Sequence, residues 1–280
     1  MPSDPHAEAE SHDELYARLA ASLPQGSDPL AYAAHFQRTR MEPLYLSGNE
    51  KGYVKGQCWK RLERALRATG RSPGALTVLD AGCGLGELSV FLACQGFQVV
   101  GVELSPRACE HAAALAERYG VGARCRFLAA SLESLPLPDA SVDGVIGHAS
   151  LHHFIKYPGV PAELRRVMRP GAEGHFADSF GEFPGYHVFH RKAAMARLGD
   201  VILTRRMLED YFQDFELTLT PTDWFVMLDK IGQRYLPARA QPAVRALSRL
   251  HFALDRRIPA RSSLALRLSG SVLTSIRKRA

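Results

Sequence analysis

A carboxylate followed by three closely spaced glycines is the feature of this 280-residue sequence best suited to chemistry. Residues 78–87 read Val-Leu-Asp-Ala-Gly-Cys-Gly-Leu-Gly-Glu, with Asp80 at the end of a short apolar run. Glycines at alternate positions let the backbone turn tightly and let a ligand touch the main chain. Glu103 lies 21 residues after Gly82, at the end of the next predicted strand, where a carboxylate can accept both hydroxyls of a ribose. The spacing therefore predicts a nucleoside site.

Two classes of cofactor use this layout, and two side chains discriminate between them. Dinucleotide-binding proteins carry Gly-x-Gly-x-x-Gly so that a pyrophosphate rests on a helix N-terminus. Glu87 occupies the position of the third glycine, where its carboxylate would repel a pyrophosphate. Asp80 suits a ligand that carries an ammonium group. Both residues favour S-adenosylmethionine, which has an amino-acid end and a sulfonium in place of phosphates.

Alternating short strands and helices must position these residues. The patterns predict strands over 75–79, 97–102, 124–128, 142–147 and 174–179, with helices over 88–94, 106–119 and 160–168. Ser105 and Pro106 form an N-cap and first-turn pair, and Pro170 with Gly171 stops the last of these helices. The alternation indicates an α/β fold with a parallel sheet covered on both faces, whose strand ends meet along one edge.

The chain is expected to have three parts. Residues 1–72 would form an N-terminal helical cap, and 73–230 the S-adenosylmethionine-binding core. Within the core, 181–203 is rich in aromatic residues and histidine and is expected to form a lid over an apolar acceptor. After the lid, a helix over 204–212 with Thr204 as N-cap precedes predicted strands over 215–219 and 224–228. Residues 231–280 would form a C-terminal extension.

The positive charge of the protein belongs to this extension. Residues 231–280 have a net charge of +10, whereas the rest of the chain has −4. Apolar residues recur every four positions near its end, which predicts an amphipathic helix: Leu264, Leu268, Val272 and Ile276. An Arg-rich amphipathic helix suits peripheral contact with an anionic membrane, and helices docked on the core are the alternative. The sequence has no motif that supports nucleic-acid binding.

Composition indicates the general class of protein to which the sequence belongs. The sequence has 46% hydrophobic and 23% charged residues, an ordinary globular balance. It has no apolar run of about 18 residues, and its first residues lack the pattern of a secretory signal. The five cysteines are widely spaced and form no Cys-x-x-Cys pair, so we expect a cytoplasmic protein with reduced thiols and no metal site.

Taken in order, the motifs resemble those of class I S-adenosylmethionine-dependent methyltransferases, and most closely the small-molecule enzymes that open with Val-Leu-Asp-x-Gly-Cys-Gly-x-Gly. The resemblance spans 74–229 and continues through 127–139, 141–154 and 164–171. It implies a Rossmann-like, doubly wound, seven-stranded, mostly parallel sheet. It also implies transfer of a methyl group to oxygen or carbon of a hydrophobic small molecule, as in secondary metabolism or on a lipid-like acceptor.

The resemblance also implies the cofactor contacts, position by position. Gly82, Cys83 and Gly84 would approach the methionyl part, with Asp80 near its amino group and Glu103 on the ribose; Leu104, Ser131 and Leu132 would surround the adenine, His148 would face the sulfonium, and Tyr53 of the N-terminal helix would contact the cofactor. Ser131 departs from the family, which usually has Asp there. A hydroxyl accepts a hydrogen bond less strongly than a carboxylate, so weaker adenine anchoring is expected.

Histidines mark the region where an acceptor would sit. His152 and His153 follow the fourth predicted strand and are the candidate catalytic bases, while His187 and His190 stand in the lid. Simple packing is the alternative for each. Residues 147–150 lack the Asn/Asp-Pro-Pro-Tyr pattern of enzymes that methylate nucleic-acid bases or glutamine. Two other functions stay open: a cyclisation or rearrangement with bound S-adenosylmethionine, and membrane-surface binding with a vestigial site.

Overall fold

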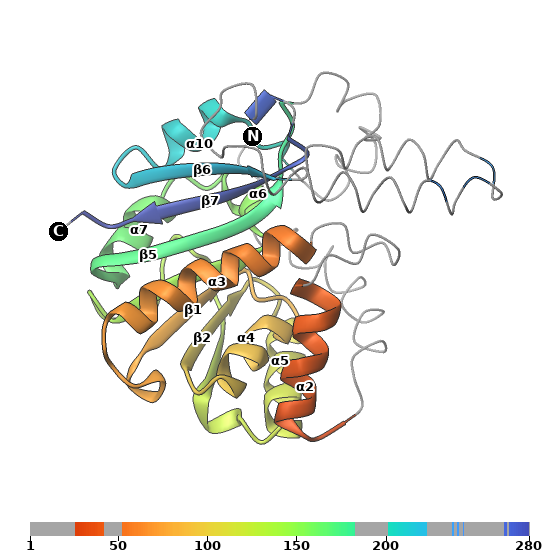
Figure 1. Cartoon of the computed structure of the whole chain (residues 1–280). Coiled ribbons are helices and arrows are strands. Elements are labelled where there is room, and N and C mark those ends of the chain that lie inside the picture. Colours follow the sequence, from red (N-terminus) through yellow and green to blue (C-terminus); the bar gives the residue numbers. More distant parts are fainter. Residues whose placement is uncertain are drawn as a thin grey trace.

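A computed structural model describes residues 26–41, 52–182, 201–222 and 269–279, together with 237, 240, 243, 266 and 267. It contains a seven-stranded sheet with the order β3-β2-β1-β4-β5-β7-β6 (Figure 1). The strands are β1 (Thr77–Ala81), β2 (Gln98–Glu103), β3 (Cys125–Ala129), β4 (Val142–His148), β5 (Met168–Ser179), β6 (Glu216–Thr222) and β7 (Ser271–Arg277). The first five strands pair in parallel, and β7 is antiparallel to both β5 and β6. The predicted seven-stranded, mostly parallel sheet is confirmed.

Helices cover both faces of this sheet. On one face lie α3 (Gly52–Ala68), α4 (Glu87–Cys94) and α5 (Pro106–Arg118), and α2 (Pro29–Phe36) packs on α4 (Figure 1). The other face carries α6 (Leu151–Phe154), α7 (Val160–Val167) and α10 (Arg205–Tyr211). Short helical turns complete the set: η1 (Gln37–Met41), η2 (Pro73–Ala75) and η3 (Gly122–Arg124). None of the helices within the described ranges is long and apolar enough to cross a membrane.

Consecutive residues of each central strand pack into two separate hydrophobic clusters, one on each face of the sheet. Val78 belongs to the cluster under α3 and α4, whereas Leu79 belongs to the cluster under α6 and α7. Val145 and Ile146 of β4 divide in the same way. Because strand side chains alternate between faces, this division shows that the sheet is buried on both sides. Burial on both sides of the sheet explains the continuous apolar runs in the sequence.

The predicted helix caps are confirmed. The Ser105 hydroxyl accepts a hydrogen bond from the Ala108 N–H at 3.0 Å, at the start of α5. Thr204 caps α10 in the same manner by accepting from the Met207 N–H at 3.4 Å. Each cap satisfies a donor that the first helical turn leaves unpaired.

The predicted C-terminal helix is wrong for residues 271–277, which form β7 inside the core sheet. Val272 and Ile276 lie on one face of this strand, and Leu273 lies on the other. A spacing of four also places two residues on the same face of a strand, so the pattern fitted both structures. The predicted strand over 215–219 is β6, and β7 is its partner. Residues 224–228 and most of the basic extension lie outside the described ranges.

Candidate active site

A cavity of about 350 Å³ opens at the carboxyl ends of β1, β2 and β4. In a parallel sheet these ends meet where the strand order reverses, which is the usual ligand position of doubly wound folds. Its lining residues come from the loops after four strands and from the N-terminal helices: Phe36, Arg40, Lys55, Asp80, Gly82, Cys83, Gly84, Leu85, Glu87, Leu88, Val102, Glu103, Leu104, Ala130, Ser131, Leu132, His148, Ala149, Ser150, His153, Phe154 and Tyr157.

The glycine loop after β1 is tied to the end of β2. The N–H groups of Gly82 and Cys83 both donate to the Val102 carbonyl, at 2.9 and 3.0 Å. Gly82 has φ +76°, and a Cβ added to it would lie 2.6 Å from the Cβ of Ser150. Glycine is required at this position both by the left-handed backbone and by the close approach of the β4 loop.

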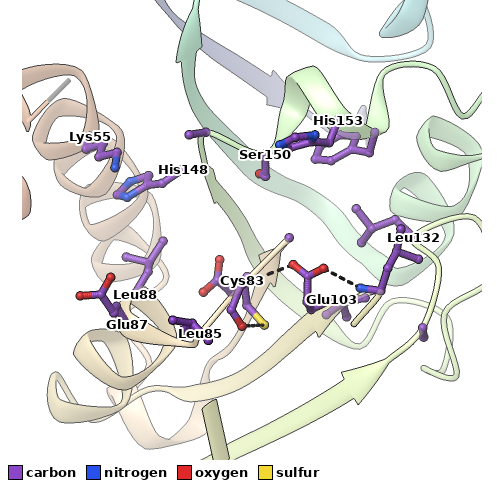
Figure 2. A pocket seen from close by; sticks show the side chains of 18 of the residues that line it. Lys55, Cys83, Leu85, Glu87, Leu88, Glu103, Leu132, His148, Ser150 and His153 are labelled. Carbon is purple, nitrogen blue, oxygen red and sulfur yellow. Dashed lines mark hydrogen bonds between the residues drawn. The ribbon is translucent and has the colours of Figure 1, made fainter. Parts of the chain in front are cut away.

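Glu103 is held in place by the backbone around the cavity. Its side chain accepts from the Leu104 N–H at 2.8 Å and from the Gly84 N–H at 3.1 Å, as Figure 2 shows. The residue is 8% exposed and lines the cavity. These bonds join the loop after β1 to the loop after β2 through one carboxylate. A carboxylate fixed at the end of β2 is well placed to accept the hydroxyls of a ribose.

Asp80 is a buried acid that a cationic ligand would suit. It is 1% exposed, and the Ser89 hydroxyl donates to it at 2.6 Å. Burial, and to a lesser degree the nearby charge of Glu103, raise the pKa of Asp80 to about 7. An opposite charge in the cavity would stabilise the ionised form. The ammonium and sulfonium of S-adenosylmethionine supply such charge, so the residues present fit this cofactor.

The N-terminal helices form one wall of the cavity. Arg40 pairs with Glu87, its Nη2 lying 3.0 Å from Oε1, and the Tyr32 hydroxyl donates to the Glu87 carbonyl at 2.8 Å. Phe36 stacks on Phe91 with ring centroids 5.1 Å apart. The Glu87 carboxylate thus lies at the cavity in a pair with Arg40. Sequence reasoning did not identify Phe36, Arg40 or Lys55, which reach the cavity only through packing between elements distant in the sequence.

Two histidines lie at the opposite wall, and only one lines the cavity. His153 lines it together with Phe154 and Tyr157, and the His152 ring contacts the His153 ring with centroids 4.1 Å apart and the ring planes tilted by 39°. His152 is itself bonded through Nδ1 to Asp178, which is completely buried and also accepts from the Leu151 N–H at 3.1 Å. Nothing in the sequence singled out Asp178, because it lies in a strand that reads as ordinary core.

Contacts of Tyr211 and Val201 connect α10 and the segment before it to this wall. The Tyr211 hydroxyl lies 2.8 Å from the carbonyl oxygens of both Phe154 and Tyr157. Val201, where the described chain resumes after residue 182, donates its N–H to the His152 carbonyl at 3.2 Å. The described chain therefore resumes at Val201 close to the predicted acceptor site.

The structure brings most of the predicted site residues together. Those that line the cavity are Asp80, Gly82, Cys83, Gly84, Glu103, Leu104, Ser131, Leu132, His148 and His153. His152 lies behind His153 and is absent from the lining set. Tyr53 lies in α3, but its side chain is outside the described part of the chain, as are His187 and His190. The individual roles of these residues stay predictions.

Comparison with known proteins identifies the class to which this fold and cavity belong. Residues 79–176 match the methyltransferase domain family. Residues 79–176 therefore form a methyltransferase domain, and this family supports the predicted cofactor, S-adenosylmethionine. The matched range runs from β1 through the cavity loops into β5.

Individual curated relatives are named as methyltransferases, and this chain matches only part of the length of each. Over 156 residues, the chain is 34% identical to a malonyl-[acyl-carrier protein] O-methyltransferase of Erwinia pyrifoliae, covering 55% of this chain and 53% of that protein. It is 33% identical over 138 residues to the 27-O-demethylrifamycin SV methyltransferase of Amycolatopsis mediterranei, covering 47% and 51%. The chain thus spans about half the length of the curated relatives it matches.

Among solved structures, the [4+2]-cyclase SpnF resembles the whole chain. The TM-score is 0.63 with 18% identity, and the match covers 99% of this chain and 98% of that one. At this identity the likeness concerns the fold alone.

Proposed function

We propose that this protein transfers the methyl group of S-adenosylmethionine to a hydrophobic small molecule. The observation that carries the proposal is a single cavity with a cofactor-type wall on one side and a wall of histidine and aromatic residues on the other. Glu103 and the glycine loop lie on one side, and His153, Phe154 and Tyr157 lie on the other. The names of curated relatives state methyl transfer to oxygen in one case and to carbon of a sterol in another, so the acceptor atom is oxygen or carbon.

Several residues of the cavity would hold the cofactor. Glu103 would accept the ribose hydroxyls, the loop from Gly82 to Gly84 would lie along the methionyl part, and Leu132 would pack at the adenine. When bound, S-adenosylmethionine supplies a methyl group made electrophilic by the adjacent sulfonium. The protein must then hold the acceptor atom on the side opposite the sulfur and exclude water, which can provide most of the acceleration.

An acceptor hydroxyl also has to lose its proton, and the His152–His153 pair is placed to take it. His153 reaches the cavity and would accept the proton at a ring nitrogen. His152, bonded to Asp178, would hold the His153 ring through this ring contact and act as a positioning residue. Phe154 and Tyr157 would pack on the apolar part of the acceptor and keep water away from the reacting atoms.

Methyl-labelled S-adenosylmethionine tests the proposal. The full chain is incubated with the labelled cofactor and an apolar extract of the cells that encode it, and the products are separated by mass. We expect a product that has gained one labelled methyl group and is absent with the His153→Gln variant. An unlabelled isomer of an extract component would instead support cyclisation or rearrangement. Consumption of S-adenosylmethionine without any labelled product would rule out methyl transfer.

A further inference from the structure

Positive side chains from three separate segments gather at the end of the sheet opposite the cavity. Figure 1 shows that α3 ends there, β5 begins there and β7 ends there. Arg71, which follows α3, pairs with Asp143 at the start of β4, and Nε of Arg169 in β5 lies 3.0 Å from Oδ1 of the same carboxylate. Lys278, which follows β7, donates through Nζ to the Met168 carbonyl at 2.6 Å. The three segments therefore form one surface.

We call this surface the basic face and define it by its cations. These are Lys60, Arg61, Arg64, Arg67, Arg71, Arg169, Arg277, Lys278 and Arg279. The carboxylates that pair with them or lie beside them are Glu63, Asp143, Glu173 and Glu216. Nine cations against four carboxylates leave the basic face with a net charge of +5. Such an excess attracts an anionic partner.

Packing of α3 on the sheet turns its cations outward. Lys60, Arg64 and Arg67 are exposed and follow one another at spacings of four and three, which places them on one side of the helix. Leu62 and Leu66, on another side, are buried in the cluster between α3 and the sheet. The orientation of the basic residues is therefore fixed by the same packing that holds the helix in place.

The neighbouring side chains discriminate between classes of anionic partner. A protein partner needs apolar side chains at the centre of its interface, and within the described ranges the large apolar side chain that is exposed, Leu30, lies on α2. Single-stranded nucleic acid needs aromatic rings for stacking, but Trp59, beside Lys60, is buried against Phe91 and Phe97. An anionic bilayer needs neither feature, because its headgroups attract clustered Lys and Arg by charge alone.

We propose that the basic face binds the surface of an anionic phospholipid bilayer by electrostatic attraction. The cavity lies at the carboxyl ends of the strands, away from the basic face, so the bound protein keeps the cavity accessible. This inference does not depend on the proposed function, since none of the nine cations lines the cavity.

Co-sedimentation of the full chain with vesicles tests this proposal. The wild type should bind vesicles of phosphatidylcholine with phosphatidylglycerol, release them at about 0.5 M salt, and leave vesicles of phosphatidylcholine alone unbound. The test variant combines Lys60→Gln, Arg64→Gln and Arg279→Gln, which removes three exposed cations. Each cation near an anionic surface contributes to binding, and we expect this variant to bind the anionic vesicles about a hundredfold more weakly.

A matched control removes the same charge from other parts of the surface. It combines Arg38→Gln, Arg126→Gln and Arg206→Gln, which lie in η1, β3 and α10. The control should bind the anionic vesicles like the wild type, and so should a charge-conserving variant with Lys60→Arg, Arg64→Lys and Arg279→Lys. Urea unfolding checks that all three variants keep the wild-type midpoint.

Four results would overturn the proposal. The wild type might fail to bind anionic vesicles, or bind duplex DNA more tightly than the vesicles at the same salt concentration. Unchanged vesicle binding by the test variant would place the interaction elsewhere on the chain. Equal weakening by the test variant and the matched control would show that net charge, and not the basic face, determines binding.

Discussion

Binding of S-adenosylhomocysteine is expected to release a proton from Asp80. Asp80 is 1% exposed, and its pKa is raised to about 7, first by burial and then by the charge of Glu103. An ammonium group within reach of the carboxylate lowers such a pKa by about 1–3. At pH 7 the free protein carries roughly half a proton on Asp80 and the complex almost none. About half a proton should therefore leave for each ligand bound at this pH.

The same linkage fixes the pH dependence of affinity. Because binding requires the ionised carboxylate, affinity falls as pH falls through the pKa of the free protein. With a pKa of about 7 before binding and about 5 after it, affinity at pH 6 should be roughly tenfold lower than at pH 8. Calorimetry at pH 7 in two buffers that differ in ionisation enthalpy counts the protons released. Asp80→Asn should bind without any proton release.

The free protein offers an independent check on this reasoning. The pKa of Asp80 in the folded state lies above its usual value of 3.8, so the folded state loses stability as pH rises from about 4 to about 7. Asp80→Asn should therefore raise the free energy of unfolding at pH 8 and change it little at pH 4. Buffer-independent binding heats, together with an affinity that does not vary from pH 6 to 8, would refute the account of Asp80.

Three further variants test other parts of the site. Glu103→Gln should weaken S-adenosylhomocysteine about tenfold to a hundredfold in calorimetry, because a carboxylate acceptor is lost, and unchanged affinity would contradict this role. Gly147→Ala would place a Cβ 2.6 Å from Ser150 Oγ and 2.8 Å from Phe176. It should cost about 1–3 kcal/mol in urea unfolding, and a wild-type midpoint would argue against the crowding. Asp178→Asn should leave S-adenosylhomocysteine binding intact, lower kcat at least tenfold and shift the pH–rate profile; a merely structural role would leave that profile in place.

The cofactor side of the site could be predicted because its signals are local. The glycines after β1 and the carboxylate of Glu103 lie at the ends of strands that the apolar runs mark clearly. Parallel strands bring such ends to one edge whatever the details of packing. Sequence spacing was therefore enough to place Asp80 and Glu103 in one cavity.

Residues that reach the cavity through long-range packing could not be predicted in this way. Phe36 lines it because α2 docks on α4, and Arg40 lines it because η1 packs on α3. Lys55 lines it because α3 packs on β4 and β5. Asp178 is placed under His152 by the pairing of β4 with β5. No periodicity reports such contacts between distant elements. The register of the sheet, and not the local sequence, selects these partners.

The error at the C-terminus has a different physical origin. Val272 and Ile276 are four residues apart, which suits one face of a helix and one face of a strand equally. Leu273 distinguishes the strand from the helix. It is buried on the opposite face of the sheet and completes a run that is buried on both sides. Such a run between polar residues is typical of a central strand. The arginines near this run also suit the polar face of an amphipathic helix, so the local sequence fits both structures.

Calorimetric titration of the full chain with S-adenosylhomocysteine, beside a titration with NAD, tests most directly whether this cavity is an S-adenosylmethionine site. We expect saturable binding of S-adenosylhomocysteine to one site and no heat from NAD. Tight binding of NAD with no heat from S-adenosylhomocysteine would contradict the account.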